Sequence, residues 1–237
     1  MQVDQITIVT ANYKTPDLIK RLVGGLLRHY PQVRLLLIDN GSKDDSTKYI
    51  RKMATSKHNI RVILNQVNAG HGPAMHQGIG YCETPLVCLI DSDCIIQKAG
   101  GLELMAAPFS DSKVYATGEL LRVDAGGNTK KKGALYIHPS RLMIDRKKYW
   151  KLPPFNHHGA PVAANMFGVA KAGYVLVNIP KINKYMHHPG QGLVKSGSHK
   201  KYGIPGWRLP VHYHPKNAPT AEERLKGAKP ILLGKWS

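Results

Sequence analysis

The segment Leu86-Val87-Cys88-Leu89-Ile90-Asp91-Ser92-Asp93 joins an apolar run to two carboxylates separated by one small residue. The five apolar residues are too few for an independent helix, and they predict a buried parallel strand. Because such strands open at their carboxyl ends into the ligand crevice, we expect Asp91 and Asp93 to project there. Two carboxylates so placed suit Mg2+ or Mn2+ gripping a diphosphate. The alternative is a solvated turn that caps the next helix.

Three strand-and-helix units precede this segment. Buried strands are predicted at 5–10, 33–38 and 60–64. Helices are predicted from Thr15 to just before Pro31, over 43–56 and over 74–81. The first helix begins with an N-cap threonine, a proline and an acid, and its expected buried stripe is Leu18, Leu22, Leu26 and Leu27. The alternation of strands and helices predicts a doubly wound parallel sheet.

Length and cysteine content limit the class of protein. The 237 residues suffice for one α/β domain, or for one domain with an appended segment. Cys82, Cys88 and Cys94 crowd one region and form no disulfide framework, which favours a reducing compartment. The N-terminal residues lack the pattern of a signal peptide, and no run reaches the 18 apolar residues of a membrane span. We therefore expect a soluble, cytoplasmic protein.

The net charge of +19 is concentrated in the second half of the chain. Residues 1–99 contain 12 basic and 8 acidic residues, a net of +4. Residues 100–237 contain 22 basic and 7 acidic residues, a net of +15. A general need for solubility does not predict this asymmetry, whereas a polyanionic partner bound by the second half does.

The glycine-rich loop 65–73 has neither G-x-G-x-x-G nor a G-K-[ST] ending, which argues against a dinucleotide oxidoreductase and a P-loop protein. It contains Asn68-Ala69-Gly70, and this motif stands in order with segments 6–13 (ITIVTANY), 38–46 (IDNGSKDDS) and 89–93 (LIDSD). Together these segments, within the first hundred residues, resemble a family 2 type glycosyltransferase of the GT-A fold. The resemblance implies one Rossmann-like, mostly parallel sheet flanked by helices.

The same resemblance implies a division of labour along the chain. Residues 1–99 would bind a nucleotide sugar and 100–194 the acceptor, and 195–237 would form a basic C-terminal strap or lid. Asp93 would bind the metal, helped by Asp91 and by His188 from the segment 182–192. The residues implied to hold the nucleotide sugar are Thr10, Ala11, Asn12, Asp39, Asn68, Gly70, Asp91 and Ser92. For Asp39 the alternative is a helix-capping turn, and for Asn68 and Gly70 a plain loop.

The catalytic base is not identified by this resemblance. Beyond residue 100 we expect a helix at 101–107, strands at 114–124, 134–139 and 141–145, and a short basic helix at 146–151. In the family a loop after the last strands carries a catalytic carboxylate, but the corresponding loop 153–161 contains no acid. Candidates for the base are two histidines of that loop and three carboxylates outside it: His157, His158, Glu119, Asp124 and Asp145. A retaining mechanism without a dedicated base also stays open.

Basic residues with interspersed aromatics suggest a nucleic-acid-binding surface. The segment 195–237 has nine Lys or Arg against two Glu, interleaved with Tyr202, Trp207, Tyr213 and Trp236. Cations neutralise phosphates, and aromatic rings stack on exposed bases. The candidate contacts lie in three clusters: Lys130, Lys131 and Lys132; Arg146, Lys147 and Lys148; and Lys200, Lys201 and Arg208.

These observations lead to the hypothesis of a metal-dependent glycosyltransferase that uses a nucleotide sugar, with a UDP-sugar as the first choice. The preferred acceptor is a hydroxymethylated base in DNA, as in some phage enzymes, which would then act in the host cytoplasm. DNA supplies both an alcohol and a polyanion, and the base must be flipped out of the stack. One alternative is a peripheral enzyme on an anionic membrane surface that acts on a lipid-linked or cell-surface polysaccharide. Another is a nucleic-acid-binding module whose transferase site has decayed. The sugar, the stereochemistry and the oligomeric state stay open.

Overall fold

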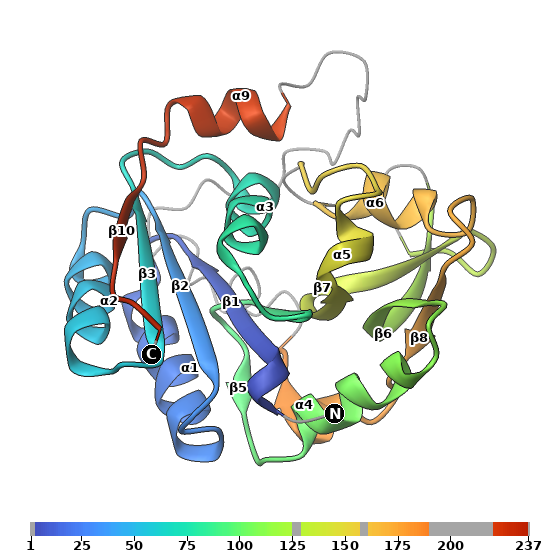
Figure 1. The fold of residues 1–237 in the computed structure, drawn as a ribbon, viewed down its shortest axis with the longest axis horizontal. Coiled ribbons are helices and arrows are strands. Elements are labelled where there is room, and N and C mark those ends of the chain that lie inside the picture. The colour runs from blue at the N-terminus through green and yellow to red at the C-terminus, as the bar shows by residue number, and fades with distance from the viewer. Residues whose placement is uncertain (1–2, 125–128, 157–160, 190–219, 237) are drawn as a thin grey trace.

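The computed structural model describes residues 3–124, 129–156, 161–189 and 220–236. One sheet has the strand order β10-β3-β2-β1-β4-β7-β6-β8 (Figure 1). The strands are β1 (Ile6–Asn12), β2 (Arg34–Asn40), β3 (Ile60–Asn65), β4 (Leu86–Ile90), β6 (Val114–Val123), β7 (Ala134–Asp145), β8 (Val175–Asn178) and β10 (Ile231–Leu233). No helix within the described ranges is long and apolar enough to cross a membrane.

The strands of the first half confirm the parallel prediction. β1 runs parallel to β2 and to β4, and β2 runs parallel to β3. Their carboxyl ends therefore lie along one side of the sheet. We call this side the carboxyl edge, and it comprises the loops that follow Asn12, Asn40, Asn65 and Ile90.

The second half makes the sheet mixed. β7 is antiparallel to β4 and to β6, β8 is parallel to β6, and β10 is antiparallel to β3. Because two reversals cancel, β6 points in the same direction as β4. The residues that follow Gly118 on β6 therefore lie at the carboxyl edge too, because Gly118 is level with Leu142 and Leu142 with Leu89.

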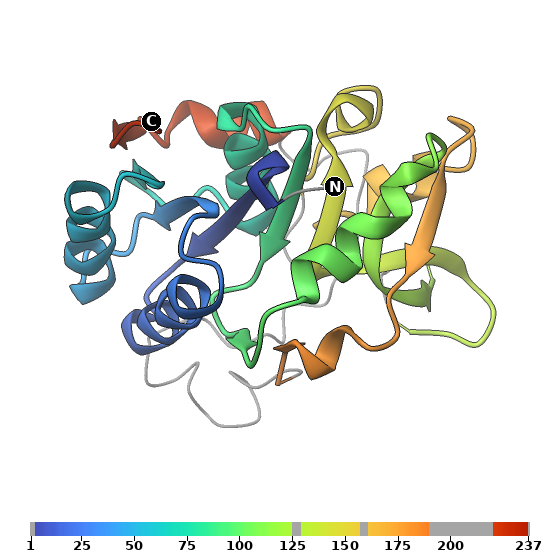
Figure 2. The ribbon, with the colours of Figure 1, turned by 60° about the horizontal axis from the view of Figure 1, so that its bottom comes forward.

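Helices cover both faces of the sheet (Figures 1 and 2). On one face α1 (Pro16–His29), α2 (Asp45–Ser56) and α4 (Gly101–Ala106) share a core with alternate side chains of the strands. On the other face α3 (His71–Tyr81), α5 (Arg146–Tyr149) and α6 (Ala163–Gly168) do the same. The strands are thus buried on both sides, which explains their near-continuous apolar runs. Short 3-10 turns occur at Val3–Gln5, Ala107–Ser110 and Ile182–Lys184.

Helix α1 differs in detail from the prediction. Its buried residues are Ile19, Leu22, Val23 and Leu26, whereas Leu18 and Leu27 are only half-buried. The prediction is therefore confirmed for Leu22 and Leu26, whereas Ile19 and Val23 take the buried positions expected for Leu18 and Leu27. Pro16 occupies the first turn as predicted. Thr15 makes no capping hydrogen bond, because its hydroxyl donates to Asn12 Oδ1 at 2.6 Å instead.

The predicted strands 134–139 and 141–145 are one strand, β7, with an irregularity in its middle. Gly118 pairs with Leu142, but Leu120 pairs with Ile137, so three extra residues of β7 bulge opposite Glu119. Gly118 has φ +156°, and a Cβ there would lie 2.4 Å from Arg141 O. The close approach of the two backbones at this bulge thus requires glycine.

Two further contacts join distant parts of the chain. A small sheet pairs β5 (Ile95–Ile96) with β9 (Met186–His187) and brings the segment before His188 next to the one after Asp93. Near the C-terminus, α9 (Ala221–Lys226) packs beside α3, and β10 extends the sheet beyond β3 (Figure 1). The backbone amide of Gln66 donates to Ala228 O at 2.7 Å, which attaches this C-terminal segment to the β3–α3 loop.

Substituting Gly118→Ala should destabilise the fold by at least about 1 kcal/mol, because the added methyl group meets backbone atoms that have no room to move. Urea denaturation measures the change. Gly24→Ala is the matched control, since a Cβ at Gly24, inside α1, meets nothing within 4 Å. Alanine there should stabilise the helix by about 0.5–1 kcal/mol. Equal midpoints for the two variants would show that the bulge tolerates a side chain.

Candidate functional site

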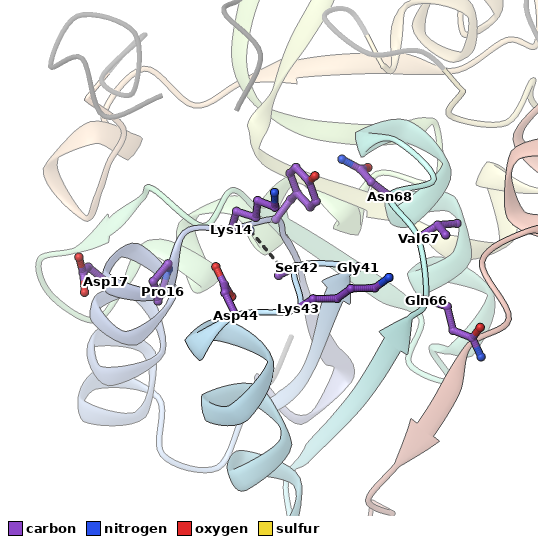
Figure 3. A pocket seen from close by; sticks show the side chains of 11 residues that line it. Lys14, Pro16, Asp17, Gly41, Ser42, Lys43, Asp44, Gln66, Val67 and Asn68 are labelled. Atoms are coloured by element: carbon purple, nitrogen blue, oxygen red, sulfur yellow. Dashed lines mark hydrogen bonds between the residues drawn. The ribbon is translucent and has the colours of Figure 1, made fainter. Parts of the chain in front are cut away.

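Loops from β1, β2 and β3 enclose a hollow of about 800 Å³ at the carboxyl edge (Figure 3). It is large enough for a nucleoside. Gly41, with φ +80°, lets the loop after β2 approach the loop after β3, because a Cβ there would lie 2.6 Å from the carbonyl carbon of Val67. The hollow is lined by Tyr13, Lys14, Pro16, Asp17, Gly41, Ser42, Lys43, Asp44, Gln66, Val67 and Asn68. Of these lining residues, only Asn68 is among those expected from the sequence to hold the nucleotide sugar.

Two lysines of this hollow have strained backbones. Lys14 (φ 54°) and Lys43 (φ 56°) are in the left-handed region, which is unusual for residues with a Cβ. Ser42 supports this geometry, because its Oγ accepts a hydrogen bond from Lys14 N at 2.9 Å. The side chain of Lys43 extends toward the loop of Gln66 and Val67 (Figure 3). The turns thus place two cations beside one cavity, an arrangement that favours an anionic ligand.

Asp39 and Thr10 present buried polar atoms without partners. Asp39 Oδ2 accepts a hydrogen bond from Thr47 Oγ1 at 2.6 Å, but Asp39 Oδ1 and Thr10 Oγ1 have none within the described part of the chain. Both residues are at most 1% exposed. Asp39 also lines a smaller hollow of about 420 Å³, together with Lys43, Arg51 and other residues. A buried acceptor without a donor is costly, so these atoms indicate a ligand that supplies an N–H or O–H group.

Asparagine side chains hold the β3–α3 loop in place. Asn40 Nδ2 donates to Asn68 Oδ1 at 2.9 Å and to Gly70 O at 3.2 Å, and Asn68 Oδ1 accepts from Gly70 N. Asn65 is joined to Asn40 and to Gln77. Asn68 and Gly70, which were expected to line the nucleotide-sugar site, therefore lie at the carboxyl edge. The side chains that orient this loop were not predicted from the sequence; they are Asn40, Asn65 and Gln77.

Asn12 and Ser92 belong to one hydrogen-bonded chain. Thr15 Oγ1 donates to Asn12 Oδ1 and lies 3.3 Å from Ser92 Oγ. This chain links the loop after β1 to the loop after β4. Ala11, which directly precedes Asn12, is half-buried near the end of β1.

The structure brings Asp91, Asp93 and His188 together. Each offers one ligand atom, and these atoms all lie within 4.8 Å of one another. His188 Nε2 is 3.5 Å from Asp93 Oδ1. Backbone hydrogen bonds fix the loop that carries the two carboxylates: Asp91 N donates to Ser140 O and Cys94 N donates to Asp91 O, each at 3.0 Å. Two carboxylate oxygens and one imidazole nitrogen form a donor set that suits Mn2+ and, less well, Mg2+.

Histidines balance the charge of the two carboxylates. His71 Nε2 lies 3.1 Å from Asp91 Oδ1. Burial alone would raise the pKa of Asp91, but the charge and hydrogen bond of His71 outweigh it and lower the pKa to about 2. Burial likewise opposes the charged form of His71, yet Asp91 raises the pKa of that imidazole. For His188, Asp93 overcomes burial in the same way and raises the pKa. Asp91 and Asp93 thus each lie against a histidine whose charged form they stabilise.

The sequence analysis missed His71 and His138. His71 is the first residue of α3 and directly follows Asn68-Ala69-Gly70, so its position in that motif was a usable signal. His138 lies in the β7 bulge, with Nδ1 2.8 Å from Ser140 Oγ and its ring 5.4 Å from the ring of His188. Burial lowers the pKa of His138. No local pattern marks it, because only the bulge brings it to the site.

The candidate bases lie in different places. Glu119 is at the carboxyl edge, where its Oε2 accepts a hydrogen bond from Arg141 at 2.5 Å. Asp124 lies farther out along the β6–β7 hairpin, 3.6 Å from Lys130 Nζ. Asp145 is at the opposite edge, because it pairs with Leu86 at the amino end of β4, and there it caps α5. His157 and His158 lie outside the described residues.

The basic clusters are also separated. Lys130, Lys131 and Lys132 are exposed on the hairpin that extends past the carboxyl edge. The second cluster is at the opposite edge, where Arg146 donates to Thr84 O and Lys148 donates to Val114 O and pairs with Asp145. Lys147 is exposed beside them. The structure therefore does not bring this cluster to the site. Lys200, Lys201 and Arg208 lie outside the described residues.

The parallel half-sheet, the hollow at its carboxyl edge and the neighbouring Asp–Asp–His set define a nucleotide-binding α/β domain with a place for a divalent cation. Residues 7–169 match the sequence profile of Glycosyl transferase family 2, and the chain belongs to that family.

Relatives with assigned names match over part of the chain. The undecaprenyl-phosphate 4-deoxy-4-formamido-L-arabinose transferase of Sodalis glossinidius is 30% identical over 99 residues, which cover 39% of this chain and 30% of that protein. The poly-beta-1,6-N-acetyl-D-glucosamine synthase of Staphylococcus epidermidis is 25% identical over 96 residues, covering 40% and 23%. The chain thus aligns with less than a third of the length of these two relatives.

Solved structures share the fold. The mannosyltransferase from Pyrobaculum calidifontis in complex with GDP-Man and Mn2+ superimposes with a TM-score of 0.61 at 16% identity, covering 75% of this chain and 55% of that one. GalNAc-T7 with UDP, GalNAc and Mn2+ gives a TM-score of 0.60 at 15% identity, covering 74% and 42%. These similarities confirm the GT-A fold.

Replacing Asp91 by Asn should lower the pKa of His71 in the metal-free protein. The charge and hydrogen bond of Asp91 are the main causes that raise this pKa, and without them the more distant charge of Asp93 is left to oppose burial, which disfavours the charged imidazole. An NMR titration of the imidazole C–H signals measures the shift. The opposite sign, or no shift, would mean that another group holds the His71 charge.

Asp93→Asn and His188→Ala should each weaken Mn2+ binding by at least about tenfold, because each removes one of three ligands. Electron paramagnetic resonance of the free ion measures the affinity without any substrate. Asp111→Asn is the control, since this exposed carboxylate follows the turn Ala107–Ser110, outside the proposed ligand set. Unchanged affinity in the first two variants would exclude these residues as ligands.

Proposed function

We propose that this protein is a metal-dependent glycosyltransferase that moves a sugar from a nucleotide sugar to a hydroxyl group of a polyanionic acceptor. One observation carries the proposal. A hollow of nucleoside size and the Asp91, Asp93 and His188 set lie at the same edge of the sheet. A nucleoside in the hollow would direct its diphosphate toward these residues.

Asp91, Asp93 and His188 are the residues that would hold Mn2+ or Mg2+. They fit, because their donor atoms all lie within 4.8 Å of one another, and because the His188 imidazole that now lies against Asp93 could turn to the metal as a ligand. A bound divalent cation would neutralise the charge that develops on the departing diphosphate. The relatives in complex with Mn2+ and GDP-Man, or with Mn2+ and UDP, support both the metal and the class of donor.

The chain's own residues would select the nucleotide. Asp39 Oδ1 has no hydrogen-bond partner among the described residues and could accept one, and the N3–H of uracil is a donor of the required kind. Thr10 Oγ1, on the neighbouring strand β1, is a second buried polar atom without a partner in the described part of the chain. Lys14 and Lys43 add positive charge beside the hollow. We therefore infer a UDP-sugar as the donor, bound by the half that spans residues 1–99.

For the acceptor, we propose a hydroxymethylated base in DNA. The net charge of +15 in residues 100–237 and the exposed Lys130–Lys132 cluster beside the carboxyl edge support a polyanion. DNA would lie across the half that spans residues 100–194, with one base flipped toward the site. The reduced Cys82, Cys88 and Cys94 fit a cytoplasmic location, that of the host if the chain comes from a phage.

A second acceptor class is favoured by the names of the relatives. One is an undecaprenyl-phosphate transferase and another a polysaccharide synthase. An anionic membrane surface would also attract the basic half of the chain. In this alternative the acceptor is a lipid-linked or cell-surface glycan.

A transfer assay separates these functions. The protein is incubated with Mn2+ and labelled nucleotide sugars, and is offered unmodified DNA, hydroxymethylcytosine DNA and vesicles that contain a polyprenyl phosphate. We expect label only in the modified DNA, with UDP-sugars preferred. Label in the vesicles would establish the alternative. DNA binding without any binding of nucleotide sugars would refute the transferase and leave a nucleic-acid-binding module.

Substituting Lys131 and Lys132 by Gln should weaken DNA binding. The slope of log K against log salt concentration should become less steep by about 0.9 for each phosphate that the protein no longer neutralises. The affinity for the nucleotide sugar should stay the same, since the hairpin does not line the hollow. The matched control changes Lys147 and Lys151, two exposed lysines at the opposite edge. Fluorescence anisotropy at several salt concentrations measures both pairs. An equal loss in the control would show that binding depends only on net charge.

A further inference from the structure

The β7 bulge places a carboxylate opposite the metal set. Gly118, Leu142 and Leu89 are level with one another across β6, β7 and β4, so Glu119 and Asp91 both lie beyond that level at the carboxyl edge. They are two strand positions apart, which corresponds to about 10 Å across the sheet. A sugar and an attacking hydroxyl group would fit in this interval.

Glu119 is held on one side and open on the other. Its Oε2 lies 2.5 Å from Arg141 Nη2, and the Arg141 side chain is only 1% exposed. The Glu119 side chain is 40% exposed, and its Oε1 has no hydrogen-bond partner in the part of the chain that the structure describes. The buried guanidinium thus orients a carboxylate that is partly exposed to solvent.

Arg141 also connects Glu119 to the metal set. Its Nη1 donates to Asn183 Oδ1 and, at 2.8 Å, to Met186 O. Met186 begins β9, and His188 follows that strand. A buried guanidinium needs such partners, because an unpaired charge in the interior is strongly destabilising. The same side chain therefore sets the position of Glu119 relative to His188.

We infer that Glu119 is the general base of the transfer and that Arg141 is its positioning residue. This inference rests on the proposed function. Glu119 Oε1 takes the proton of the acceptor hydroxyl while the hydroxyl oxygen forms a bond to the anomeric carbon. The bond from that carbon to the diphosphate oxygen breaks, and its electron pair leaves with the nucleoside diphosphate. The configuration at the anomeric carbon inverts, because the base and the leaving group lie on opposite sides.

Glu119→Gln tests the inference, because the amide oxygen of Gln still accepts a hydrogen bond from Arg141 but cannot take a proton. We expect transfer, or donor hydrolysis where water is the acceptor, to slow by about 10²- to 10⁴-fold. The affinity for the UDP-sugar, measured by calorimetry with Mn2+, should stay within about twofold, which is small beside the roughly tenfold loss expected for a removed metal ligand. Glu222→Gln, at an exposed carboxylate of α9, is the charge-matched control and should behave like the unaltered protein.

Azide distinguishes a base from a purely structural residue. Azide carries no proton to remove, so the Gln variant and the unaltered protein should form the glycosyl azide at the same rate, with inverted configuration by NMR. An equal loss with azide, retention of configuration, or full transfer activity in the Gln variant would each overturn the inference and leave the proposed function intact. If the unaltered protein binds no nucleotide sugar, both the inference about Glu119 and the proposed function are wrong.

Discussion

The antiparallel pairing of β4 with β7 is the constraint on which the site depends. It attaches the second half of the chain directly to β4, the strand that Asp91 follows. Ser140, in the bulge, accepts the hydrogen bond of Asp91 N, and Arg141 extends from the same bulge toward Glu119 and the segment before His188. One strand thus positions groups on both sides of the space where a sugar would lie.

Electrostatic compensation explains how two carboxylates remain close together in a partly buried site. Asp91 and Asp93 would repel each other in a medium of low polarity. His71 lies against the first and His188 against the second, so each carboxylate has an imidazole beside it whose charged form it favours. His188 can exchange this role for that of a ligand. His71 stays beside Asp91 and would keep it oriented.

Local patterns predicted much of the first half. The apolar runs predicted four parallel strands, and Asp91 and Asp93 were expected at the carboxyl end of the fourth strand, where they are found. Asp39 and Asn68, expected from the family resemblance, lie at the same edge. The second half was less predictable. The bulge of β7 makes one strand look like two in the sequence, and the sequence offered Asp124, Asp145 and Glu119 equally as candidates for the base. Only the strand register shows that Glu119 lies at the carboxyl edge and Asp145 at the opposite one.

The sequence by itself determined the class of fold and the family resemblance, because apolar runs, helix starts and the residues at strand ends are local properties of the chain. Only the tertiary structure decided which distant groups meet. His188 reaches Asp93 through the pairing of β5 with β9, and Arg141 reaches Glu119 because three extra residues of β7 bulge at that point. Such contacts depend on strand register, and a shift of one residue would turn every side chain to the opposite face.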